Sequence, residues 1–243
     1  MPEAMLLWAE RVGKRFGAHT VLTDVDFAVR AGEAVGIVGP NGAGKTTLLA
    51  ALSGAFPVSS GTIAWKGRDI TALDAARRCR LGIGRSHQVP RPFTGMTVFE
   101  NVLTAALQGG GFGRNEGYGR SIEALELCGM TQLANRRAET LGLLDRKRLE
   151  LTRALATAPD LLLLDEIGGG LTDGEATELV ATIRLIRERG VTIVWIEHIV
   201  HVLVQVVERL VCMDAGRVIA DGTPDAVLAD ATVVSAYLGG HPA

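Results

Sequence analysis

The sequence has few cysteines, and no pair of them is spaced as CxxC. Cys79, Cys128 and Cys212 are the only three, an odd number. This pattern argues against a disulfide framework and against a zinc site, and it fits a reducing compartment. We therefore expect all three to be buried as small apolar residues.

Long apolar runs and an excess of positive charge are also lacking. No uncharged apolar stretch approaches the roughly 18 residues that a membrane-spanning helix needs, and residues 1–11 do not show the basic-then-apolar layout of a signal peptide. We expect the chain to stay in the cytoplasm and to reach a membrane only through a partner protein. The formal charge of -2, with lysine and arginine dispersed along the chain, argues against nucleic acid as a partner.

The chain is long enough for one substantial core, since 47% of its 243 residues are hydrophobic. Near-alternate apolar residues over 21–29 predict strands of a half-exposed sheet. Residues 34–38 predict a short apolar strand, and a glycine-rich turn then leads to a helix over 44–52. This strand-loop-helix order is typical of α/β proteins.

The second half of the chain continues the α/β pattern. Apolar runs at 161–164 and 191–196 predict strands covered on both faces. They flank a predicted helix over 174–188, which ends at Gly190. A last strand near 217–220 and short helices over 223–238 complete the prediction.

The middle of the chain is predicted to be a helical insertion over 89–150. Thr97 and Glu100 form a possible capping box for a helix through Leu107. The glycine-dense stretch 109–119 predicts a mobile loop, after which helix resumes from Ile122.

A phosphate-binding loop is the strongest motif. The segment fits G-x-x-x-x-G-K-[ST] between an apolar strand and a helix, so it is more than a glycine-rich turn with a solvated lysine. Its glycines let backbone N–H groups surround phosphates, Lys45 neutralises charge, and the Thr46 hydroxyl is a candidate Mg²⁺ ligand. The candidate nucleotide-binding residues are Gly39, Pro40, Asn41, Gly42, Ala43, Gly44, Lys45, Thr46 and Thr47.

Two adjacent carboxylates follow the strand predicted at 161–164. Nucleotide sites of open α/β sheets lie at the carboxyl ends of strands, which is where Asp165 and Glu166 are expected. We expect Asp165 to hold Mg²⁺ through water and Glu166 to act as the general base on the attacking water. An acidic pair after a strand is by itself more often a helix cap, so the interpretation depends on the phosphate loop.

With these motifs in this order, the whole chain resembles the ATP-binding subunits of ABC transporters, and most closely their branched-chain amino-acid uptake branch. The segment 82–93, with 96–102 after it, is similar to the Q-loop of that branch. The resemblance implies that Gln88 reaches the Mg²⁺ and the attacking water and senses the membrane subunit. His87 stands where the family usually has an aromatic residue and is given no catalytic role.

Two further residues take roles only from the resemblance. His198, after the strand at 191–196, matches the switch histidine that contacts the γ-phosphate; without the resemblance it would be an ordinary polar residue. Phe16 matches the aromatic residue that stacks on adenine, and a core phenylalanine is the alternative.

The chain departs from the family at its signature sequence, usually Leu-Ser-Gly-Gly-Gln. The matching stretch is 141–145, where Gly142 removes a hydroxyl and Leu144 adds a branched side chain. The usual residues place a hydroxyl and bare N–H groups against the γ-phosphate of the opposite subunit. Smaller departures are Ile167, where a proline is usual, and the segment 168–172, which lacks the usual aspartate.

The resemblance implies a single ABC ATP-binding domain over 1–243. Its fold class is α/β, with a RecA-like P-loop NTPase core of ABC ATPase type over about 1–88 and 151–243. An N-terminal antiparallel β subdomain and an α-helical subdomain, about 89–150, are expected in addition.

The implied function is that of a subunit that binds and hydrolyses ATP with Mg²⁺ and energises an importer for branched-chain or related amino acids. The implied partners are membrane permease subunits, a second ATP-binding subunit in a homo- or heterodimer and, indirectly, a solute-binding protein. The chain would then sit on the inner face of the membrane. The alternatives are a nucleotide-gated dimerisation module with little hydrolysis and a soluble ATPase acting on ribosomes or DNA. GTP is disfavoured because no Asn-Lys-x-Asp element stands out.

Overall fold

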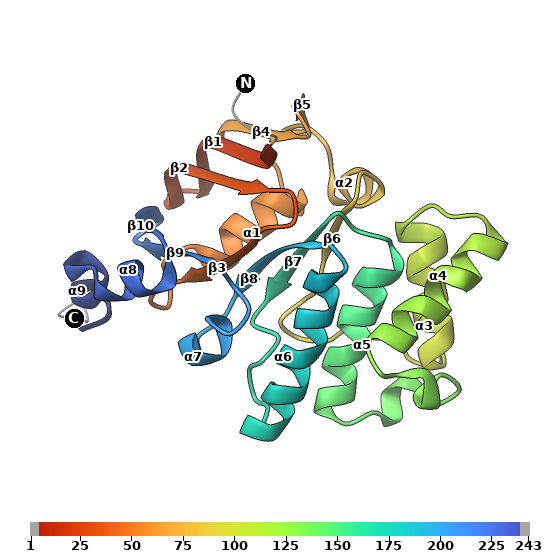
Figure 1. Ribbon diagram of the computed structural model, residues 1–243. Coiled ribbons are helices and arrows are strands. Elements are labelled where there is room, and N and C mark those ends of the chain that lie inside the picture. Colours follow the sequence, from red (N-terminus) through yellow and green to blue (C-terminus); the bar gives the residue numbers. More distant parts are fainter. Residues whose placement is uncertain (1–4, 239–243) are drawn as a thin grey trace. The chain divides into compact units, whose positions relative to one another are not determined.

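The computed structural model describes residues 5–238 and divides them into two compact units. One unit takes the chain up to residue 75 together with the part from residue 192 onward, and the other takes residues 76–191. Figure 1 shows the elements of both units with their labels. In the described part of the chain, no helix has the length and apolar character needed to cross a membrane.

An antiparallel sheet begins the first unit. Its strand order is β2-β1-β4-β5. Buried and exposed residues alternate along much of β1 and β2, so the prediction of a half-exposed sheet is confirmed. The strands are β1 (Met5–Phe16), β2 (His19–Arg30), β4 (Ser60–Trp65) and β5 (Arg68–Asp69).

A second set of strands in this unit carries the phosphate loop. Strand β3 (Ala34–Val38) lies between β8 (Thr192–Ile196) and β9 (Arg209–Asp214) and runs parallel to both, while β10 (Arg217–Gly222) is antiparallel to β9. Every residue of β3 and β8 is buried, as expected of parallel strands covered on both faces. The helices of this unit are α1 (Lys45–Ser53), α7 (Val200–Leu203), α8 (Pro224–Ala229) and α9 (Ala231–Leu238).

The second unit combines a short parallel strand pair with most of the helices. Strand β6 (Ile83–Arg85) is parallel to the fully buried β7 (Leu161–Asp165). The capping box at Thr97 and Glu100 is present and begins α3. The helices are α2 (Ala75–Arg80), α3 (Val98–Thr104), the π-helix η1 (Ala105–Gly109), α4 (Arg114–Leu127), the 3₁₀ turns η2 (Thr131–Leu133) and η3 (Ala138–Thr140), α5 (Leu143–Ala156) and α6 (Asp173–Glu188).

The prediction of a mobile loop over 109–119 is wrong. Helix α4 already begins at Arg114, well before Ile122, and only residues 110–113 lie outside helices. Gly117 is buried in α4, and a Cβ at this position would come within 2.6 Å of Leu107 Cδ2. This glycine therefore serves close packing of α4 against η1, and the glycine count alone concealed the helix.

The expectation for the cysteines is confirmed for two of the three. Cys128 and Cys212 are buried, whereas Cys79 is only partly covered. Burial raises the pKa of the Cys128 thiol to about 12 and that of Cys212 to about 11. Both side chains therefore remain protonated thiols at neutral pH.

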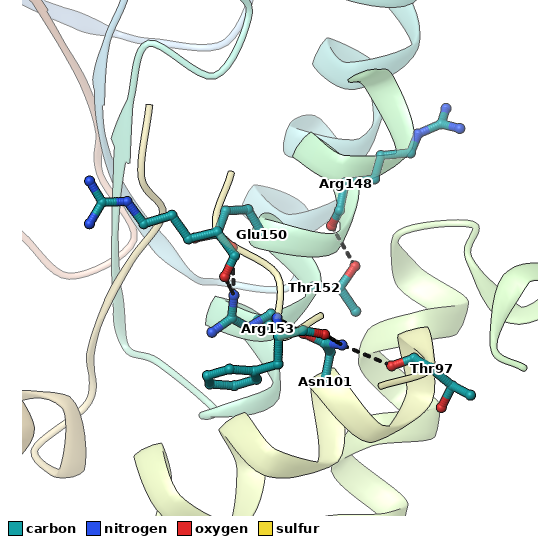
Figure 2. A network of polar contacts seen from close by, with 8 residues as sticks. Thr97, Asn101, Arg148, Glu150, Thr152 and Arg153 are labelled. Atoms are coloured by element: carbon teal, nitrogen blue, oxygen red, sulfur yellow. Dashed lines mark hydrogen bonds and ion pairs between the residues drawn. The ribbon is translucent and has the colours of Figure 1, made fainter. Parts of the chain in front are cut away.

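A buried asparagine fixes the chain that precedes α3. The Asn101 side chain accepts a hydrogen bond from the Phe93 N–H (2.7 Å) and donates to the carbonyls of Phe93 (3.1 Å) and Thr97 (2.9 Å). Asn101 is fully buried, and its contact with Thr97 is drawn in Figure 2. One side chain thus satisfies three backbone groups on the loop between β6 and α3.

We predict that Asn101→Ala lowers the free energy of unfolding by about 2–4 kcal/mol, because several backbone groups lose their partner at once. Urea denaturation of the two proteins measures this difference. Asn115→Ala is the matched control, since Asn115 is exposed on α4 and loses no such contact. Equal stabilities of the two variants would contradict the role of Asn101.

Candidate functional site

The phosphate loop joins β3 directly to α1. Its backbone has positive φ at Gly39 (144°), Gly42 (82°) and Gly44 (98°), which only glycine adopts readily. No side chain caps the N-terminus of α1. Anions bind at helix starts of this kind, because the first N–H groups of a helix lack partners within it.

Close packing within the first unit holds the loop in this shape. A Cβ on Gly39 would lie 2.0 Å from the Met213 carbonyl oxygen, so β9 admits only glycine here. The N–H of Gly216, just before β10, donates to the Ala43 carbonyl at 3.1 Å. Lys45 is buried, and its Nζ donates to the carbonyls of Gly39 (2.8 Å) and Pro40 (3.0 Å).

Phe16 presents an aromatic ring at the surface of the same unit. It is 49% exposed, which excludes the alternative of a core phenylalanine. The ring packs edge-on against Phe56, with centroids 5.3 Å apart, and Lys14 Nζ lies over both rings. Its exposure leaves the ring accessible for stacking on a flat ligand.

The carboxylate of Asp165 is buried at the end of β7 and is paired with an arginine. Arg85, the last residue of β6, donates from Nη2 to Asp165 Oδ2 at 2.9 Å. Sequence reasoning gave Arg85 no role. The signal lies in the strand pairing, because Arg85 is in register with Leu163, two residues before Asp165.

The next carboxylate is bound by the glutamine that the Q-loop resemblance singled out. Gln88 Nε2 donates to Glu166 Oε2 at 2.5 Å. Glu166 itself has φ of 47°, an uncommon conformation for a residue with a side chain, which costs roughly 1–2 kcal/mol. Strain of this kind clusters at functional sites.

The predicted site residues thus form two groups, each within its own unit. The phosphate loop, Phe16 and the exposed His198, which follows β8, belong to the first unit. Gln88, Asp165 and Glu166 belong to the second unit, where Gln88 binds Glu166 and Arg85 binds Asp165. His87 is also exposed, and desolvation of its ring, with nearby Arg85 adding to it, lowers its pKa.

An apolar loop follows Gln88. Its side chains Val89, Phe93 and Met96 are all exposed, so they do not belong to the core of the second unit. Arg153 contacts this loop at two places. Its Cζ lies 4.7 Å from the Phe93 ring centroid, and its Nη1 donates to the Arg91 carbonyl.

Beside this loop lies a cavity of about 270 Å³, lined by residues that include His87, Phe93 and Arg153. Glu150, also in its lining, orients Arg153 through an ion pair of 2.8 Å (Figure 2). The exposed apolar loop thus lies beside a cavity whose lining includes the Glu150–Arg153 ion pair.

The segment that matches the signature sequence begins α5. Gly142 is the N-cap and provides no side-chain cap. Leu143, the first helical residue, is 46% exposed, and Asp145 adds a carboxylate to the first turn. Arg146 fastens the turn by donating to the carbonyls of Leu141 and Glu139.

Comparison with known proteins gives matches along nearly the whole chain. The family model described as ABC transporter matches residues 22–168, and the model described as branched-chain amino acid ATP-binding cassette transporter matches residues 217–243. The high-affinity branched-chain amino acid transport ATP-binding protein LivG of Salmonella typhimurium is 35% identical, over 93% of this chain and 94% of its own. The lipopolysaccharide export system ATP-binding protein LptB of Haemophilus influenzae is 32% identical, over 96% and 97%.

Solved structures agree with the sequence comparison. A nucleotide-free ATP-binding cassette from an ABC transporter has a TM-score of 0.87 and 28% identity, covering 96% of this chain and 98% of its own. An ADP-bound cassette has a TM-score of 0.86, also at 28% identity, with coverage of 97% and 99%. These matches confirm the fold class expected from the sequence.

We predict that Arg85→Met lowers the free energy of unfolding by about 2–4 kcal/mol, because it leaves the buried Asp165 carboxylate without this cation. Thermal or urea denaturation measures the loss. Arg114→Met is the matched control, because Arg114 is exposed at the start of α4.

Adding Asp165→Asn to Arg85→Met removes the buried negative charge, so the double variant should regain part of the lost stability. An Arg85→Met protein as stable as the Arg114→Met control would show that the pair does not stabilise the second unit.

Proposed function

Because the chain belongs to the ABC transporter family, in which it is an ATP-hydrolysing cassette, we propose that it energises an importer for branched-chain or related amino acids. The observation that carries the proposal is the phosphate loop, with its left-handed glycines, its buried lysine and an uncapped helix after it. The full-length similarity to LivG supports the transport class. It does not support the alternative of a dimerisation module with little hydrolysis.

The phosphate loop would hold the nucleotide through its backbone. N–H groups of the loop after Pro40 and of the N-terminus of α1 would surround the phosphates, since anions bind at such helix ends. Lys45 would exchange the carbonyls of Gly39 and Pro40 for phosphate oxygens. Phe16, with its exposed ring, would stack on the adenine.

The residues of the second unit would direct the attack on the γ-phosphate. Glu166 would take a proton from the attacking water as general base. Gln88, which already donates to the Glu166 carboxylate, would orient that water and report on the membrane subunit. His198 of the first unit would donate to the γ-phosphate.

We propose Thr46, Asp165 and Gln88 as the Mg²⁺ ligands that the resemblance implies. The Thr46 hydroxyl, which is exposed at the start of α1, and the Asp165 carboxylate, with Gln88, are hard oxygen ligands of the kind that Mg²⁺ binds beside phosphate and water. Bound there, Mg²⁺ would neutralise charge that develops on the phosphates. Arg85 would have to share Asp165 with the metal, because it donates to one of its oxygens.

The solute is proposed from two matches. LivG and the C-terminal family model both name branched-chain amino acids, while LptB belongs to a lipopolysaccharide export system. The C-terminal match over 217–243 therefore favours amino-acid import. Permease subunits would place the chain on the inner face of the membrane, and a solute-binding protein would act on the permease.

We propose the exposed loop over 89–96 and the cavity beside it as the permease contact. The apolar side chains Val89, Phe93 and Met96 are exposed together, and the loop follows Gln88 directly. Force on this loop would reach Glu166 through the Gln88 hydrogen bond.

We further propose that the subdomains keep the expected bounds, with the core over about 1–88 and 151–243 and the helical part over about 89–150.

The second ATP-binding subunit is proposed to be a related chain. At the start of α5, Leu144 adds a branched side chain and Asp145 a carboxylate beside the first N–H groups, and Gly142 supplies no hydroxyl. Such a helix start is poorly suited to a γ-phosphate. In a heterodimer, a partner with an intact signature would complete the site of this chain, and the other site would turn over slowly.

We predict that Glu166→Gln lowers ATP turnover by about 100-fold or more, the contribution of a general base, while ATP binding persists. Lys45→Ala should weaken ATP binding roughly tenfold to a hundredfold, because a charge-assisted hydrogen bond is lost. Calorimetry of the purified chain measures binding, and a phosphate-release assay with the second ATP-binding subunit present measures turnover. Unaltered turnover in Glu166→Gln would refute the assignment of the base.

The same assay tests the composition of the dimer. Binding without turnover by the lone chain, and turnover when the partner is added, is the result expected of a heterodimer. Glu166-dependent turnover by the lone chain would show instead that residues 141–145 function in a homodimer.

We also predict that Phe93→Asp abolishes uptake by the assembled transporter but leaves ATP binding to the free subunit unchanged, since burying a carboxylate at an apolar contact is costly. Radiolabelled uptake and co-purification with the permease measure the effect. Ile122→Asp is the control, because Ile122 is equally exposed but lies on α4. Normal uptake by Phe93→Asp would place the permease contact elsewhere.

A further inference from the structure

A side chain near the end of the described chain binds the first glycine of the phosphate loop. The Tyr237 hydroxyl, on α9, accepts a hydrogen bond from the Gly39 N–H at 2.7 Å. The two residues are 198 positions apart in sequence and belong to the same unit. Helix α9 follows α8 and β10 in that unit (Figure 1).

Helix α9 is fixed well enough to position this hydroxyl. Asp230 accepts hydrogen bonds from the N–H groups of Thr232 (2.7 Å) and Val233 (3.3 Å), which satisfies donors of the first turn. Val233 is buried, and the helix contacts both α8 and β10. The tyrosine therefore projects from an anchored helix.

The hydroxyl stays neutral at physiological pH. Burial, and then the neighbouring Cys212 thiol, raise the pKa of Tyr237 above its ordinary value. A neutral hydroxyl with a free lone pair is a good acceptor for a backbone N–H. The contact is thus an uncharged hydrogen bond in a partly covered place.

Both the N–H and the carbonyl of Gly39 are hydrogen-bonded to side chains. Its N–H donates to Tyr237, and its carbonyl accepts from the catalytic-site lysine, Lys45, at 2.8 Å. The Met213 carbonyl excludes any side chain here. Gly39 therefore links α9 to the ammonium group that is proposed to meet the phosphates.

We propose that Tyr237 is a positioning residue of the nucleotide site. It acts through Gly39, holding the start of the phosphate loop so that the loop and Lys45 are ordered before nucleotide arrives. Preorganisation of this kind lowers the entropic cost of binding. This inference rests on the proposed function, and it adds a residue outside the loop itself.

The test is Tyr237→Phe, which deletes one oxygen and keeps the ring. Tyr118→Phe is the matched control, because Tyr118 is the other tyrosine of the chain, is exposed to a similar extent and lies on α4 in the other unit. We expect the Gly39 amide of the Tyr237→Phe protein to exchange about fivefold to tenfold faster, as seen by NMR, because a neutral hydrogen bond is lost. ATP and ADP should both bind about threefold to tenfold more weakly.

A residue that merely anchors α9 would lower the melting temperature but leave nucleotide affinity unchanged below it. Unchanged affinity, or unchanged exchange at Gly39, in Tyr237→Phe would overturn the proposal. In the assembled transporter the KM for ATP should rise while kcat is retained. Failure of the wild-type chain to bind ATP would instead refute the proposed function, and the Gly39 exchange rate would still decide whether Tyr237 holds the loop.

Discussion

The nucleotide site depends on one constraint: backbone N–H groups between β3 and α1 must be able to face an anion. These groups can face an anion only if the chain turns sharply after a rigid strand, and left-handed φ at Gly39, Gly42 and Gly44 provides the turn. Rigidity comes from β3, which is wholly buried between β8 and β9. The loop is therefore held by residues far from it in sequence, including Met213, Gly216 and Tyr237.

A second constraint governs the carboxylates. Asp165 is buried and needs a cation, and Arg85 supplies one from the neighbouring strand. A buried charge without a partner would cost several kcal/mol. The pair therefore also stabilises the end of β7, which Glu166 follows directly. The left-handed backbone of Glu166 and its hydrogen bond to Gln88 then position the Glu166 carboxylate.

Local signals in the sequence were sufficient for most elements and for the motifs. The capping box at Thr97 and Glu100, the apolar runs of β3, β7 and β8, and the phosphate loop each depend on residues close together along the chain. The first turns of α4 were missed because the glycine-dense stretch 109–119 was taken as a loop and helix was expected only from Ile122, whereas Gly117 lets Leu107 approach the helix. The number of glycines in a stretch does not reveal which of them allow two helices to pack closely.

Two contacts at the site that sequence reasoning could not find span long separations. Arg85 meets Asp165 across 80 residues, and Tyr237 meets Gly39 across 198. Neither pair forms a motif, because each depends on strand register or on where a helix docks.

These long-range contacts support the motifs from outside. The phosphate loop and the acidic pair can be recognised in the sequence because the proposed ATP hydrolysis demands their residue types. A residue that only positions them needs no more than one suitable polar atom at the right place. A hydroxyl can provide that atom from almost any element, which is why sequence identifies the reacting groups more readily than the residues that hold them.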